Sequence, residues 1–238
     1  MTKVWDPFWI SAFQTEFVPE LNAIVDALEK RLLPNFKEDE IEEESERITE
    51  EAFERFMSMS GTGEGDPSYF AEKAEKAGIS HYILINGIRQ GMLNLFATML
   101  FHAFEQQAIY FYRRNVLPQS EENEPKRLEL LVFQCQLKEY GIDIKKFSSW
   151  PKIDELRLVA NTVKHAEGRS SQQLHEKRPD MFRNPHLLDF SQFISDPAPH
   201  VFQPLVGDGL HVSIQDIKDY RDHLVRFWLE LADVMQYA

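Results

Sequence analysis

The stretch from Ser80 to Arg114 contains no proline, and its apolar residues surround nearly the whole circumference of a helix. A surface helix shows one apolar stripe, whereas a helix that is apolar on most sides is covered by neighbours. Other helices must therefore pack around this one to bury its surface. The pattern predicts an all-α fold, a single bundle of about six or seven helices with residues 80–114 in its core.

Helix-start and helix-end signals place the other elements along the chain. Asp6-Pro7 combines an N-cap acceptor with a proline in the first helical turn, and Asp66-Pro67 repeats this pattern. Because glycine is common just past the end of a helix, the helix that starts at Pro67 is expected to stop at Gly78. The other expected helices span 6–33 with a kink at Pro19, 38–56, 125–140, 151–168 and 213–236.

The segment 169–212 differs in composition, since prolines, histidines and short apolar clusters replace the helical period. We expect it to be irregular, with a small hairpin around Gly207-Asp208-Gly209. No internal repeat and no linker composition marks a second domain. The chain is therefore expected to form one helical domain over 1–238, which begins with an acidic helical hairpin at 6–60.

The charge balance limits the partners of the chain. It has 26 Lys and Arg against 39 Asp and Glu, a formal charge of −13, so any contact with nucleic acid requires a local basic patch. Residues 38–56 are dense in glutamate, yet their few apolar residues fall near one helical face. A solvated acidic face is the simplest interpretation, and docking of a basic protein partner is the alternative.

Cys135 is the only cysteine, which excludes an internal disulfide and four-cysteine metal sites and fits a reducing compartment. It stands among apolar residues and is expected to lie in the core. The first 16 residues do not resemble a signal peptide. The most apolar run, 92–104, is shorter than the roughly 20 residues that cross a bilayer. A cytoplasmic protein without membrane spans is expected.

Several catalytic and ligand-binding motifs are missing from the chain. Residues 61–65 are rich in glycine but contain Glu64 and lack the Gly-Lys-Ser/Thr of a phosphate loop. No Gly-x-Ser-x-Gly occurs, and the Glu-x-x-His pairs of dinuclear helical bundles are absent as well. We therefore predict no cofactor and no metal.

The predicted helix 151–168 is cleanly two-faced. Its polar side carries cations, an amide and an imidazole, and Arg157, Asn161 and His165 follow one another at i, i+4 steps. Cations bind phosphate, an amide orients a substrate, and an imidazole transfers protons near neutral pH, so the stripe has the groups that RNA cleavage needs. The alternative is a solvated face whose last cations complement the helix dipole. The polar residues that form this stripe on the helix 151–168 are Asp154, Arg157, Asn161, Lys164 and His165.

The sequence Ala160-Asn161-x-x-Lys164-His165 resembles the signature helix of the HEPN superfamily, small helical domains found in bacterial toxins, phage-defence proteins and RNA-processing nucleases. The family pattern is an arginine, usually followed by a polar residue such as asparagine, and a histidine after four to six intervening residues. Asn161 and His165 match the polar and histidine positions. Ala160 stands at the arginine position, and seven residues separate Arg157 from His165.

The resemblance implies a HEPN-like core over about 80–238, a homodimer with a shared cleft, and metal-independent RNA binding or endoribonuclease activity, in a toxin or phage-defence setting. It implies that His165 is the general acid or base, that Arg157 and Lys164 bind phosphate, and that Asn161 orients the substrate. Glu105 is the residue that we match to the family's acidic or polar position on an earlier helix.

Two other hypotheses belong to different classes. The first is a non-catalytic helical interaction module with a degenerate site, which uses the acidic helix 38–56 and a homo-oligomeric face; the charge of −13 favours it. The second is an enzyme that binds a small molecule or nucleotide through the histidine-rich segment 175–211. No sequence motif supports this hypothesis.

Overall fold

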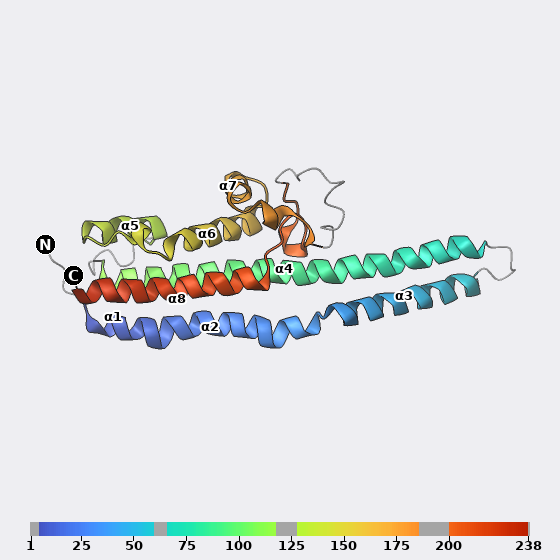
Figure 1. Ribbon diagram of the computed structural model, residues 1–238, viewed down its shortest axis with the longest axis horizontal. Coiled ribbons are helices and arrows are strands. Elements are labelled where there is room, and N and C mark those ends of the chain that lie inside the picture. The colour runs from blue at the N-terminus through green and yellow to red at the C-terminus, as the bar shows by residue number, and fades with distance from the viewer. Residues whose placement is uncertain (1–4, 60–65, 118–127, 186–199, 238) are drawn as a thin grey trace.

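The computed structural model describes residues 5–59, 66–117, 128–185 and 200–237. All regular elements in these ranges are helical, which confirms the predicted all-α bundle. The helix α4 (Pro67–Asn115) runs along most of the length of the molecule, and the other helices lie beside it (Figure 1). If the helical stretch 7–32 is counted as one helix, these ranges contain seven α-helices, in agreement with the expected number.

The first helical stretch alternates between helix types. Asp6 accepts a hydrogen bond from the Phe8 amide and so caps α1 (Pro7–Ala12). Pro19, where a kink was expected, is the second residue of α2 (Val18–Ala27), and a π-helical turn, Phe13–Phe17, lies immediately before it. A second π turn, Leu28–Leu32, and a 3-10 turn, Leu33–Asn35, complete the stretch.

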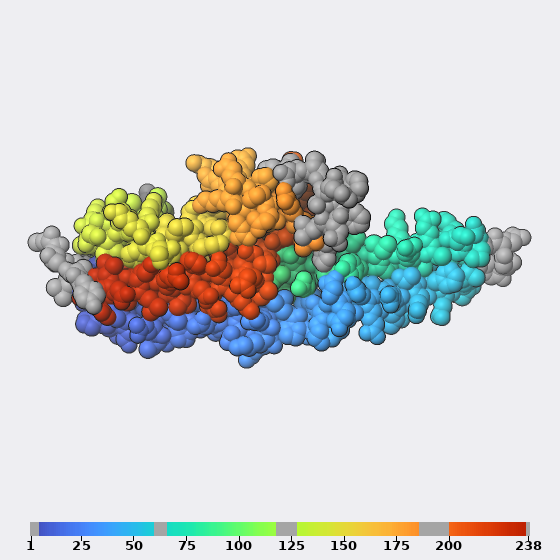
Figure 2. Space-filling view, in the orientation of Figure 1, coloured from blue at the N-terminus to red at the C-terminus, as the bar shows by residue number. Residues whose placement is uncertain are grey.

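The helix α3 (Glu38–Met59) packs antiparallel to the first half of α4, and together they form an arm that extends beyond the rest of the bundle (Figures 1 and 2). The expectation that a short helix ends at Gly78 is wrong, because α4 continues through it. A Cβ atom at Gly78 would lie 2.0 Å from the Thr49 side chain and 2.7 Å from the Ser45 carbonyl. Glycine is needed here because α3 and α4 approach closely.

The C-terminal helix α8 (Ile214–Tyr237) covers the second half of α4 and contacts α2. Trp228 is fully buried against Phe13, Phe17 and Phe104, and its indole N–H donates to Gln107 at 3.0 Å. Buried aromatic rings with a satisfied polar group form the centre of this core.

The helices α5 (Leu130–Glu139) and α6 (Trp150–His165) lie on the side of α4 and α8 that faces away from α1 and α2, and a 3-10 turn at Ile144–Lys146 joins them (Figure 1). The expectation that Cys135 lies in the core is wrong, because the residue is exposed. Phe133 and Leu137 occupy the buried face of α5, and Cys135 lies on the opposite face.

The segment after α6 is more regular than expected. Residues 169–177 form α7 (Arg169–Lys177), and 3-10 turns follow at Pro179–Phe182 and Pro204–Val206. The expected hairpin is wrong, since residues 207–213 form no strand. The buried Asn94 of α4 replaces strand pairing: its amide donates to the carbonyls of Pro204 (2.6 Å) and Leu210 (2.9 Å) and accepts from the Val212 amide (3.2 Å).

Within the described ranges, no helix is both long enough and apolar enough to cross a membrane.

Candidate functional site

The helix α6, which carries the predicted polar stripe, is fixed at its N-terminal end by α8. The carboxylate of Glu230 accepts hydrogen bonds from the backbone N–H and the hydroxyl of both Ser148 and Ser149, at 2.5–3.3 Å. Partial burial by itself would raise the pKa of the Glu230 carboxyl, but these hydrogen bonds outweigh it and lower the pKa. At the other end, Ala166 has a positive φ of 55° and ends the helix directly after His165.

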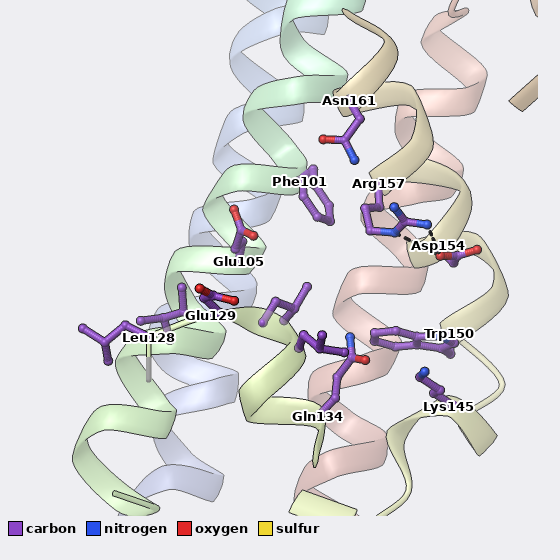
Figure 3. A pocket seen from close by; sticks show the side chains of 13 residues that line it. Phe101, Glu105, Leu128, Glu129, Gln134, Lys145, Trp150, Asp154, Arg157 and Asn161 are labelled. Carbon is purple, nitrogen blue, oxygen red and sulfur yellow. Dashed lines mark hydrogen bonds and ion pairs between the residues drawn. The ribbon is translucent and has the colours of Figure 1, made fainter. Parts of the chain in front are cut away.

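A cleft of about 800 Å³ lies between α4, α5 and α6 (Figure 3). The helix α4 contributes Phe101 and Glu105, and α6 contributes Arg157 and Asn161. Figure 3 shows these side chains directed toward the space between the two helices. The remaining lining residues are Ile109, Leu128, Glu129, Leu130, Leu131, Gln134, Lys145, Trp150 and Asp154.

The structure brings together three of the five predicted site residues. Glu105, Arg157 and Asn161 line the cleft, although α4 and α6 are distant in sequence. Lys164 and His165 do not line it; they are exposed at the C-terminal end of α6. In the described part of the chain, His165 has no hydrogen-bond or ion-pair partner. The predicted convergence of all five residues is therefore not reached within one chain.

Arg157 is already paired. Its Nε and Nη2 atoms donate to Oδ1 of Asp154 at 3.1 and 2.8 Å, and Lys177 of α7 donates to the other oxygen at 2.9 Å. Partial burial would raise the pKa of the Asp154 carboxyl, but the two cations outweigh it and lower the pKa. A phosphate that binds to Arg157 must compete with a carboxylate that stays ionised near neutral pH.

The charges of the cleft do not favour an anion in its interior. Among the described lining residues there are three carboxylates against the two cations Arg157 and Lys145. One of the carboxylates, Glu105, lies 3.1 Å from the ring of His102 on the same helix. Phe101 and Trp150 add aromatic surface, and Asn161 and Gln134 add amides. Such a lining suits a flat polar group that offers hydrogen-bond donors better than it suits a phosphate.

Sequence reasoning missed several residues of this site. The pairing of Asp154 with Arg157 follows from their i, i+3 spacing on one helix and was open to prediction. Trp150 carries a weaker signal, as a tryptophan at the start of a polar helix. Nothing in the sequence pairs Glu230 with Ser148, because that contact joins segments far apart in the chain.

Among the residues described, no group of three or more His, Cys, Asp or Glu side chains is arranged to hold a metal ion.

No family model, curated protein or solved structure matches this chain. The resemblance to HEPN domains therefore depends on the residues of α6 and on the position of Glu105.

Proposed function

We propose that this chain is a HEPN-like protein that binds single-stranded RNA along α6. The observation that carries the proposal is that Glu105 of α4 lies in one cleft with Arg157 and Asn161 of α6. The resemblance implied an acidic residue on an earlier helix that faces the polar stripe, and nothing in the local sequence requires these helices to meet in this register.

The lining of the cleft supports binding of nucleobases. Proteins recognise single-stranded RNA by stacking splayed bases on aromatic rings and by hydrogen bonds to the base edges. The partly exposed Trp150 offers aromatic surface, the amide of Asn161 pairs with donor and acceptor edges, and the carboxylate of Glu105 accepts from exocyclic amino groups. The carboxylates of Glu105 and Glu129 would repel the phosphates, so the RNA backbone would follow the α6 side of the cleft, where Arg157 lies.

The exposed end of α6 supplies the groups for the RNA backbone. Lys164 and His165 lie there, followed by the exposed Arg169 at the start of α7. In metal-independent cleavage, the ribose 2′-hydroxyl attacks the adjacent phosphorus and the 5′-oxygen leaves. His165 would take the proton from the nucleophile or give one to the leaving oxygen. Lys164 would stabilise the phosphate charge, joined by Arg157 once it separates from Asp154.

Binding is tested with a fluorescently labelled single-stranded RNA. Asn161→Ala and Glu105→Ala should each weaken the affinity severalfold to about tenfold, because each removes about 1 kcal/mol of hydrogen bonding. Gln106→Ala is the matched control, since Gln106 is the exposed neighbour of Glu105 on α4 and does not line the cleft. Equal affinities for all four proteins would contradict base recognition in the cleft.

Cleavage is tested separately with His165→Ala. A general acid or base contributes about 100-fold or more, so the variant should lose cleavage by at least this factor while its melting temperature stays unchanged. His200→Ala is the control, because its side chain is 62% exposed and already pairs with Glu167. Cleavage that persists in the His165 variant would contradict the catalytic role.

A second candidate, a protein interaction module, is favoured by an uncovered apolar face on α4. Ile88, Leu95 and Met99 are 44%, 49% and 39% exposed, and Ile85 and Met92 between them are half-buried. These five residues follow the alternating three- and four-residue spacing of a coiled-coil seam. No charged side chain interrupts this α4 seam, so the same seam of a second copy can pack on it without charge repulsion.

The α4 seam is tested by light scattering after chromatography. Wild-type protein should be dimeric at micromolar concentration, and Ile88→Glu with Leu95→Glu should make it monomeric. Ile83→Glu is the matched control, since Ile83 is 64% exposed on another face of the same helix.

The acidic outer face of α3 is tested by changing Glu42, Glu43 and Glu46 to Lys, which should abolish capture of a basic partner protein.

A further inference from the structure

A second cavity, of about 350 Å³, lies where α4, the segment 180–185 and the start of α8 meet. It shares no lining residue with the cleft between α4, α5 and α6. The side chains of Arg89, Arg183 and His211 line it, and each comes from a different segment of the chain. Asp180 is the one carboxylate among the lining residues that are described.

Arg89 is the unusual member of this set. It is partly buried, its Nε atom is fully buried without a hydrogen-bond partner, and the guanidinium has no ion pair with the described residues. A buried donor that is left unsatisfied costs free energy, and a charged one costs more. A ligand in the cavity that supplies a hydrogen-bond acceptor to Arg89 would offset this cost.

The walls around Arg89 are held in place by hydrogen bonds. The next residue, Gln90, donates to the Val212 carbonyl at 2.9 Å and to Asn94 at 3.1 Å. The His211 amide donates to the Met181 carbonyl at 2.7 Å, which ties the strip before α8 to the 3-10 turn at Pro179–Phe182. The cavity is thus formed before any ligand enters, which lowers the entropic cost of binding.

The acidic groups nearby are already engaged. Asp180 accepts hydrogen bonds from Arg178, with the shortest at 2.7 Å, and this contact lowers the pKa of its carboxyl. Asp216 caps the start of α8 by accepting from the Ser213 amide and hydroxyl, and also accepts from Arg178. Neither of these carboxylates pairs with Arg89, so no described carboxylate balances its charge.

We propose that this cavity binds a phosphoryl group, carried by inorganic phosphate or by a small phosphate ester. Two arginines and a histidine from three segments line the space, and such a set of donors suits a tetrahedral group with several acceptor oxygens better than a flat carboxylate. The volume lies within the range of small-molecule sites, so a phosphate with an attached organic group fits. The site does not depend on the RNA-binding proposal.

The experiment follows thermal unfolding of the full chain while inorganic phosphate or adenosine monophosphate is added at constant ionic strength with chloride. A ligand that binds only the folded state raises the melting temperature with the logarithm of its concentration. Arg89→Met should abolish this rise, and Arg114→Met, an exposed arginine on the same helix, should keep it. Arg89→Lys should retain part of the rise, because it keeps the charge and loses the fork.

The outcomes separate the sources of the phosphoryl group. An equal response to both compounds identifies the phosphoryl group itself as the ligand, and a response to the nucleotide alone identifies an ester. Both results support the site if they disappear in Arg89→Met and persist in Arg114→Met. The proposal is overturned if neither compound changes the melting temperature, or if Arg89→Met responds like the wild-type protein. A folded far-UV circular dichroism spectrum of the variant confirms that the lost response is not lost folding.

Discussion

Arg157 and Arg89 have similar positions and opposite environments. Each lies on a helix, is partly buried and lines a cavity. Arg157 has a carboxylate partner three residues earlier on its own helix, whereas Arg89 has none among the described residues. A guanidinium that already has a carboxylate partner must give it up before it binds an anion, whereas a guanidinium without one is ready to bind. Arg89 is therefore the better marker of an anion site, although Arg157 is the arginine of the HEPN-like stripe.

Arg178 has more carboxylate partners than either Arg157 or Arg89. Its guanidinium donates to Glu155 of α6, to Asp180 beside it and to Asp216 of α8, all at 2.7–3.2 Å. The hydrogen bond to Asp180 and the other two carboxylates raise the pKa of Arg178 further above its ordinary value. This arginine joins three segments and is surrounded by three carboxylates that repel an anion, so its role is structural.

The largest effect on stability is expected from removing Glu155, one of the three carboxylates that accept from Arg178. Oε1 of Glu155 accepts from Arg178 (2.8 Å), Lys152 (3.0 Å) and Tyr220 (2.9 Å). Glu155→Ala leaves these donors without their acceptor and should lower the free energy of unfolding by about 3 kcal/mol, measured by urea denaturation. Glu167→Ala, which removes an exposed carboxylate, should change it by less than about 0.5 kcal/mol. Equal costs would mean that the paired arginine is not structural.

A middle-sized effect is expected when Arg157 is made to resemble Arg89. Asp154→Asn removes the charge that Arg157 and Lys177 share, and should raise the affinity for single-stranded RNA severalfold. Because the Asp154 side chain is 32% exposed, the stability cost is about 1 kcal/mol or less. An unchanged RNA affinity would mean that Arg157 does not contact the ligand.

The pH dependence of that variant gives a second check. The folded-state pKa of Asp154 lies below the ordinary value of 3.8, so its contribution to stability is present above that pH and is lost as the pH falls through the folded-state pKa. The free energies of unfolding of wild-type and Asp154→Asn protein should therefore differ at pH 7 and converge as the pH falls below the folded-state pKa. A difference that persists in acid would assign the effect to packing.

Local sequence signals predicted the helices and failed where tertiary contacts decide. Residues 38–56 and 213–236 carry a helical period and caps, and both form helices close to these bounds. Glycine often follows the end of a helix, which is why Gly78 suggested one. In the fold, the close approach of Thr49 is what requires a glycine at this position. Asn94 organises residues 204–212, and no pattern within that segment shows that its partner lies on α4.

The candidate site was predicted in part for the same reason. The i, i+4 spacing places Arg157 and Asn161 on one face of α6, and both line the cleft with Glu105. His165 continues that spacing, but the helix ends there and its side chain lies beyond the cleft. Arg89 could not be selected from the sequence, because an arginine at that position looks like any solvated cation. Only the positions of the carboxylates around it, which the fold sets, show that it has no partner among the described residues.

The smallest expected effect distinguishes the two arginines directly. Arg157→Met removes a partly exposed ion pair and should lower the free energy of unfolding by about 0.5 kcal/mol. Arg89→Met removes a buried donor without a partner and places an unbranched apolar side chain against Leu93, so it should leave stability unchanged or raise it by about 1 kcal/mol. Both are measured by urea denaturation in a buffer without phosphate. If Arg89→Met lowers the free energy of unfolding as much as Arg157→Met or more, Arg89 contributes to folding. This result would contradict the proposal that the cavity is a ligand site.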